Sequence, residues 1–184
     1  MFIHEMFQQK PCVFSVEVFP PKKAGAAEET LYPVLRELCT LGPDYISVTY
    51  GAGGGTAGQS TAKIASYIKN GLHVEALAHL TCVNSTRVQV EETLTRLRED
   101  NVENVLALRG DINPDLPRRM DFLHASDLAK AIAQTGGFGV AGACYPEGHM
   151  ESPSLKADVE SLRYKAEAGV SHLITQLFFD NVSY

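Results

Sequence analysis

The sequence predicts an α/β protein in which about six parallel strands alternate with about five helices. Two observations support this prediction: short apolar runs typical of buried strands, and longer segments between them whose apolar residues recur at helical spacing. Such alternation implies right-handed crossover connections. An open doubly wound sheet and a (β/α)8 TIM barrel both satisfy it, and the pattern leaves both open. A complete barrel needs about 250 residues, so residues 1–184, predicted as one domain, would supply a truncated barrel of about six strand-helix units.

The predicted strands are apolar and bounded by turn residues. They cover residues 12–19, 45–50, 75–82, 103–108, 138–144 and 172–179. The last connecting helix is expected to begin with Ser152 as its N-cap and Pro153 at its first helical position. Its buried stripe would consist of Leu155, Val159, Leu162 and Ala166.

Composition and charge narrow the class of protein. The net charge of −6 disfavours nucleic acid or an anionic membrane surface as the main partner. The first seven residues include an acid, and no long apolar region follows, so neither a signal peptide nor a spanning helix is expected. The four cysteines are widely spaced and three lie in apolar runs, which favours buried free thiols in a cytoplasmic protein. No Cys/His grouping has zinc-ligand spacing, so no metal site is expected.

Polar or ionisable residues stand near one end of each predicted strand. Glu17 shares a strand face with Val13 and Ser15, where an ionised carboxylate is costly unless it is paired. Arg109 and Asp111 follow the strand at 103–108. The other strands contribute Ser47, Thr49, His79, Thr81, Tyr145, His149 and Gln176. Because the carboxyl ends of parallel strands meet at one edge, these residues predict a single site there.

Short sequence motifs do not identify the ligand of this site. No Gly-x-Gly-x-x-Gly fingerprint follows the first strand, and no P-loop lysine motif occurs. The glycine-rich stretch at 51–55 could cradle a phosphate with backbone N–H groups, although such clusters are more often turns.

Six motifs, taken in order, resemble the 5,10-methylenetetrahydrofolate reductase family over nearly the whole chain. They are Ser15-Val16-Glu17-Val18-Phe19-Pro20-Pro21-Lys22, Ser47-Val48-Thr49-Tyr50-Gly51-Ala52-Gly53-Gly54, Ala78-His79-Leu80-Thr81-Cys82, Ala107-Leu108-Arg109-Gly110-Asp111, Tyr145-Pro146-Glu147-Gly148-His149 and Ile174-Thr175-Gln176-Leu177-Phe178-Phe179-Asp180. Each motif alone is weak, whereas the series at family spacing is specific. One departure is the neutral run at 55–61, where the family carries charged residues.

The resemblance implies a (β/α)8 barrel that holds FAD at the carboxyl ends of its strands. The positions that correspond to flavin contacts are Thr49, His79, Arg109, Gly110, Asp111, Ala143, Tyr145, His149, Asp158 and Lys165. Glu17 corresponds to the general acid, and Gln176 to a folate contact. Asp111 lies where the family has an acid near both flavin and pterin, so Glu17, Asp111 and Gln176 are the expected substrate-binding residues, and Glu17 and Asp111 the catalytic ones.

The implied reaction is a ping-pong reduction of 5,10-methylenetetrahydrofolate to 5-methyltetrahydrofolate, with NAD(P)H as the electron donor. Glu17 would lead to protonation of the bridging nitrogen of the folate and opening of the ring to an iminium. A buried glutamate suits this task because burial raises its pKa. The Asp111 carboxylate would stabilise the cation, and Lys165 and Arg109 suit the flavin phosphates.

Two further readings remain beside the reductase. One is a non-catalytic flavin- or folate-binding module, or an assembly subunit that needs a partner chain. The other is an unrelated barrel aldolase or synthase, for which the lysines fit poorly as Schiff-base residues. A homo-oligomer or a partner subunit is expected, and the sequence does not distinguish NADH from NADPH.

Overall fold

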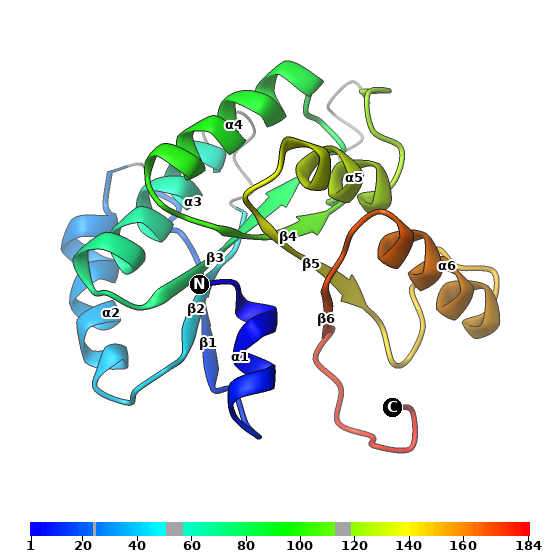
Figure 1. Ribbon diagram of the computed structural model, residues 1–184, viewed down its shortest axis with the longest axis horizontal. Coiled ribbons are helices and arrows are strands. Elements are labelled where there is room, and N and C mark those ends of the chain that lie inside the picture. The colour runs from blue at the N-terminus through cyan, green and yellow to red at the C-terminus, as the bar shows by residue number, and fades with distance from the viewer. Residues whose placement is uncertain (24, 51–56, 113–118) are drawn as a thin grey trace.

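The structure is a computed structural model that describes residues 1–23, 25–50, 57–112 and 119–184 (Figure 1). Its six strands are β1 (Ser15–Val18), β2 (Tyr45–Val48), β3 (Glu75–Thr81), β4 (Asn104–Leu108), β5 (Gly139–Cys144) and β6 (His172–Thr175). All pairs are parallel, and the spatial order β1-β2-β3-β4-β5-β6 is the chain order. A doubly wound sheet reverses its order at a switch point. The sequential, curled sheet is therefore that of a truncated TIM barrel.

Helices alternate with these strands along the chain. They are α1 (Ile3–Gln9), a π-helical turn η1 (Ala27–Leu31) continuing into α2 (Tyr32–Cys39), α3 (Ala57–Ser66) continuing into a second π-helical turn η3 (Tyr67–Gly71), α4 (Arg87–Glu99), α5 (Ala125–Thr135) and α6 (Leu155–Glu167). Figure 1 shows α2 to α6 along the outer side of the curl, whereas α1 lies on its inner side. Among the described residues, no helix is long and apolar enough to cross a membrane.

The strand alternation divides the core into two layers. On the outer face, Val48, Ala78 and Val105 belong to one buried cluster with helix residues such as Leu35 and Leu94. On the inner face, a second cluster contains Ile3 and Met6 of α1 together with inward residues of the strands. Those strand residues are Tyr45, Leu77, Leu106 and Ala141. Helix α1 therefore fills the interior of the curl, beneath the carboxyl ends of the strands.

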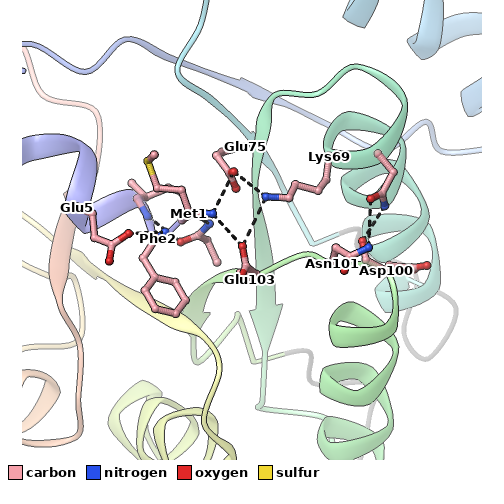
Figure 2. A network of polar contacts seen from close by, with 11 residues as sticks. Met1, Phe2, Glu5, Lys69, Glu75, Asp100, Asn101 and Glu103 are labelled. Carbon is pink, nitrogen blue, oxygen red and sulfur yellow. Dashed lines mark hydrogen bonds and ion pairs between the residues drawn. The ribbon is translucent and has the colours of Figure 1, made fainter. Parts of the chain in front are cut away.

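The start of α1 is held by polar contacts at the amino ends of β3 and β4 (Figure 2). The Met1 ammonium lies 3.2 Å from Glu75 Oε1 and 2.9 Å from Glu103 Oε2. Lys69 Nζ joins the same two carboxylates, at 2.6 Å and 3.5 Å. The Ile3 N–H donates to Oδ1 of the fully buried Asn104 at 2.9 Å, so one of the free N–H groups of the helix start is satisfied.

Ile3→Ala is expected to lower the free energy of unfolding by about 2–5 kcal/mol, because the residue is fully buried and its loss leaves a cavity beneath four strands. Denaturant unfolding followed by circular dichroism measures the change. Phe7→Ala on the same helix is the matched control, since Phe7 is 51% exposed, and its effect should stay below about 1 kcal/mol. Equal losses in the two variants would contradict the assignment of Ile3 to the core.

Several predicted boundaries differ from the structure. The strands predicted at 12–19 and 172–179 shorten to β1 and β6, because β2 and β5 offer pairing partners only over Tyr45–Val48 and up to Cys144. The N-terminal helix α1 was not predicted, since its buried face consists of only Ile3 and Met6. The predictions for the glycine-rich loop at 51–55 lie outside the described residues.

The prediction for α6 is wrong in two respects. Its N-cap is Ser154, whose hydroxyl accepts from the Ala157 N–H at 3.1 Å, whereas Ser152 lies before the helix and donates to the Ser154 carbonyl. Its expected buried stripe is open: Leu155 and Val159 are more than half exposed, and none of its residues is fully buried. A stripe is buried only where neighbours cover it, and α5 covers one side of α6.

The thiols also differ in part from expectation. All four cysteines are free, but only Cys82 is fully buried; Cys39 and Cys144 are half-buried and Cys12 is exposed. Burial raises the pKa of the Cys82 thiol to about 12, which keeps it protonated and unreactive.

Candidate functional site

A cavity of about 1560 Å³ opens at the carboxyl ends of the strands. Segments that follow β2, β3, β4 and β5 line it, together with residues of α3, α4, α5 and α6. This is the edge at which parallel α/β barrels bind ligands. Polar groups from four consecutive strand ends therefore converge on one space, whereas the sequence pattern predicted contributions from all six strands.

The end of β4 supplies Arg109, Gly110 and Asp111. Gly110 has φ +84°, and a Cβ there would lie 3.0 Å from Cβ of Thr81, so both backbone conformation and close packing require glycine. The Arg109 carbonyl accepts from the N–H groups of Cys82 and Val83, which ties this turn to the end of β3. Asp111 is exposed along the cavity wall.

Arg109 forms a two-point ion pair with Glu151, from the loop after β5. Nη1 lies 2.6 Å from Oε2, and Nη2 lies 2.7 Å from Oε1. The paired carboxylate raises the pKa of Arg109, which stays charged. Such fork geometry is how guanidinium groups recognise planar or phosphate anions. Glu151 was not among the predicted site residues, because only the folded path of the loop after β5 brings it next to Arg109.

The segment after β5 is organised around His149. Its backbone N–H donates to Asp158 Oδ2 at 3.0 Å, and its ring packs edge-on against Tyr145 with centroids 4.7 Å apart. Lys165, on α6, donates to the Ala143 carbonyl, and burial lowers the pKa of its ammonium. These contacts bring the α6 residues Asp158 and Lys165 to the end of β5.

Three inward side chains on adjacent strands form a polar cluster beside the cavity. Ser47 Oγ lies 2.6 Å from His79 Nε2 and 3.4 Å from Glu17 Oε2, and the latter two atoms are 3.5 Å apart. Burial lowers the pKa of His79 to about 4, so its imidazole is neutral near pH 7. Burial also raises the pKa of Glu17, although its side chain is 49% exposed.

The sequence matches one protein family over nearly its whole length. The family model for methylenetetrahydrofolate reductase matches residues 2–184. The chain belongs to this family. A 5,10-methylenetetrahydrofolate reductase of Pectobacterium carotovorum subsp. carotovorum is 39% identical over 170 residues, covering 92% of this chain and 56% of the relative. The Escherichia coli (strain K12) protein of the same name is 36% identical with the same coverage. The chain thus spans about half the length of these curated relatives.

Comparison of structures supports the fold alone. An oxaloacetate acetylhydrolase aligns with TM-score 0.66 at 12% identity, over 98% of this chain and 64% of that one. An uncharacterized Clostridium thermocellum protein that binds two copies of 5-methyl-5,6,7,8-tetrahydrofolic acid aligns with TM-score 0.60 at 15% identity, over 97% and 59% of the two chains.

The structure brings most of the residues that the methylenetetrahydrofolate reductase resemblance singles out to one place. Ten of them line the cavity: Thr49, His79, Arg109, Gly110, Asp111, Ala143, Tyr145, His149, Asp158 and Lys165. Glu17 and Gln176 do not. Glu17 reaches the cavity through Ser47 and His79, and Gln176 is exposed just after β6, where its N–H donates to the Cys144 carbonyl at 2.8 Å. The described part of the chain contains no cluster of three metal-ligating side chains.

Proposed function

We propose that this protein carries out the FAD-dependent reduction of 5,10-methylenetetrahydrofolate to 5-methyltetrahydrofolate with NAD(P)H. The observation that carries the proposal is the convergence of ten family positions from six separate elements and loops on one cavity. Membership of the methylenetetrahydrofolate reductase family supports the reaction class. We further propose a cytoplasmic protein that works on small-molecule folate and nicotinamide substrates as a homo-oligomer or with a partner subunit.

The residues around the cavity fit a flavin dinucleotide. The volume of the cavity exceeds the range of about 300–1000 Å³ that is typical of ligand pockets, so a large ligand can be accommodated. Arg109 and Lys165 supply cationic donors for a diphosphate, since both lie on the wall. The neutral His79 imidazole can donate or accept a hydrogen bond.

The chain's own residues have distinct tasks in the proposed reaction. FAD, when bound, supplies hydride transfer between the nicotinamide and the folate. Glu17 holds the proton that leads to opening of the folate ring, and burial raises its pKa above that of an ordinary glutamate. The exposed Asp111 carboxylate faces the same cavity and stabilises the positive charge that develops on the folate.

One observation favours a second candidate, a non-catalytic flavin-binding module that requires a partner chain. The proposed acid Glu17 and folate contact Gln176 lie outside the cavity that the flavin positions line. In that case the chain would bind FAD without turning over folate.

A visible absorption spectrum separates the two candidates. The purified protein is incubated with FAD, desalted and examined for a retained flavin band. NADH or NADPH should then bleach the band, and methylenetetrahydrofolate should restore it. A retained band that neither nicotinamide bleaches would favour the binding module. A folded protein without any retained flavin would contradict flavin binding by this chain alone.

Arg109→Ala is expected to weaken FAD binding on the order of 10- to 100-fold, the effect of losing charge-assisted hydrogen bonds to a phosphate. Fluorescence titration of FAD measures this loss. Glu151→Gln is the matched variant, because it removes the carboxylate that pairs with Arg109 and leaves the guanidinium in place. It should bind FAD at least as tightly as the unaltered protein. Equal affinities in the Arg109→Ala variant and the unaltered protein would remove Arg109 from the flavin site.

A further inference from the structure

Ser47 stands between the two ionisable groups of the inner polar cluster. It is 6% exposed on β2, flanked by Glu17 on β1 and His79 on β3. The register pairs Glu17 with Ser47, which sets both side chains on the same inward face. The ionisable side chain that faces Glu17 from β3 is His79. His79 lines the cavity, whereas Glu17 does not.

Two arrangements let the hydroxyl bond to both neighbours, and they differ in whether Glu17 Oε2 carries a proton. A hydroxyl has one proton to donate and accepts through its lone pairs. If Glu17 is ionised, Ser47 donates to its carboxylate and accepts from a protonated His79 Nε2. If Glu17 is protonated on Oε2, the carboxyl donates to Ser47, which then donates to an unprotonated His79 Nε2. In each arrangement the neutral imidazole carries its single proton on a different nitrogen.

The 2.6 Å contact makes mixed arrangements costly. Two lone pairs, or two hydrogens, directed at each other over the distance between Ser47 Oγ and His79 Nε2 would repel at a buried site. The tautomer of His79 therefore determines whether the Ser47 hydroxyl donates to Nε2 or accepts from it. This choice in turn determines whether Ser47 accepts from Glu17 or donates to it.

We infer that Ser47 is a positioning residue that couples the protonation state of Glu17 to the tautomer of His79. The hydroxyl holds the Glu17 carboxyl in both of its states and transmits its state to the imidazole at the cavity wall. The importance of this coupling for turnover rests on the proposed function, in which Glu17 is the acid. The coupling itself rests on the three distances alone.

Nuclear magnetic resonance tests the coupling without flavin or folate. The protein is labelled with ¹³C at the glutamate carboxyl and ¹⁵N in the imidazole, and Glu17→Gln identifies the Glu17 signal. As Glu17 titrates, the ¹⁵N shifts of His79 should move between the values of its two neutral tautomers with the same midpoint. In Ser47→Ala that correlated movement should be lost, and the Glu17 midpoint should move to higher pH, because the hydroxyl stabilises the carboxylate.

Two variants complete the experiment. Ser47→Thr keeps the hydroxyl and should retain the coupling, whereas Ser15→Ala, on the same inward face of β1 but exposed, should leave both signals unchanged. Constant His79 shifts through the Glu17 titration of the unaltered protein would overturn the inference. So would coupling that persists in Ser47→Ala, which would assign it to the direct 3.5 Å contact between Glu17 and His79. Absence of flavin binding would contradict the proposed function, but it would not change the coupling between Glu17 and His79 that these spectra measure.

Discussion

Glu17→Gln is expected to abolish folate reduction while FAD binding and flavin reduction by NAD(P)H persist. General acid catalysis contributes roughly 10²- to 10⁴-fold to a rate, and an amide cannot supply the proton. Glu17 lies beside the cavity and not on its wall, so its loss should leave the flavin contacts intact. Because burial raises its pKa, a larger fraction of Glu17 is protonated at a given pH than of an ordinary surface glutamate.

Stopped-flow spectroscopy separates the two halves of this reaction. Bleaching of the flavin by NAD(P)H should proceed at the unaltered rate, and its reoxidation by methylenetetrahydrofolate should slow. Glu147→Gln is the matched control, since Glu147 is an exposed carboxylate in the loop after β5 that does not line the cavity. Reoxidation at the normal rate in Glu17→Gln would exclude Glu17 as the acid.

The folded protein is expected to lose stability as the pH falls from about 6.5 to about 4. An unfolded histidine takes up a proton near pH 6.5, whereas burial lowers the pKa of both His79 and His172 in the folded state to about 4, and nearby His4 contributes to the shift at His172. The unfolded state therefore binds more protons throughout this interval, and the free energy of unfolding declines with falling pH. His79 alone accounts for about 3 kcal/mol of this loss. Glu17 acts in the opposite direction just above its ordinary pKa, because the folded state holds its proton at higher pH.

Urea unfolding at pH 7, 5.5 and 4.5 measures this dependence. His79→Gln removes one of these two imidazoles and should flatten the decline between pH 6.5 and 4.5. His73→Asn serves as the control, because His73 is exposed and its φ of 58° suits asparagine. A decline in His79→Gln as steep as in the unaltered protein would show that His79 is not the group responsible.

Periodicity alone predicted part of the outer layer of the fold: Val34 and Leu41 of the same helical stripe as Leu35 are exposed. Leu35, Leu94 and Leu128 each belong to an apolar stripe at helical spacing in a different helix. All three are buried in the core between the helices and the sheet. Where a helix has a partner on only one side, the same reasoning failed: Leu155 and Val159 of α6 are exposed. An apolar stripe records where a neighbour is needed, but it does not establish that the neighbour is present.

The site divides in the same way. Residues that follow strands, such as Arg109 and Tyr145, were predictable because all parallel strands end at one edge. Glu151 and Ser47 were not assigned roles, because their partners lie 42 and 32 residues away in the chain. No local pattern encodes such contacts.

The sequence by itself determined the alternation of strands and helices, the inward face of β1 that carries Glu17, and the family to which the motifs belong. The tertiary structure confirmed the curled, sequential sheet that the resemblance implies. It alone decided that α1 fills the interior of this sheet and that Glu17 meets His79 through Ser47. The physical reason is the separation along the chain over which each interaction acts. Backbone propensity and side-chain alternation act between residues close in sequence, whereas strand order, core filling and side-chain pairing depend on which distant surfaces exclude water together.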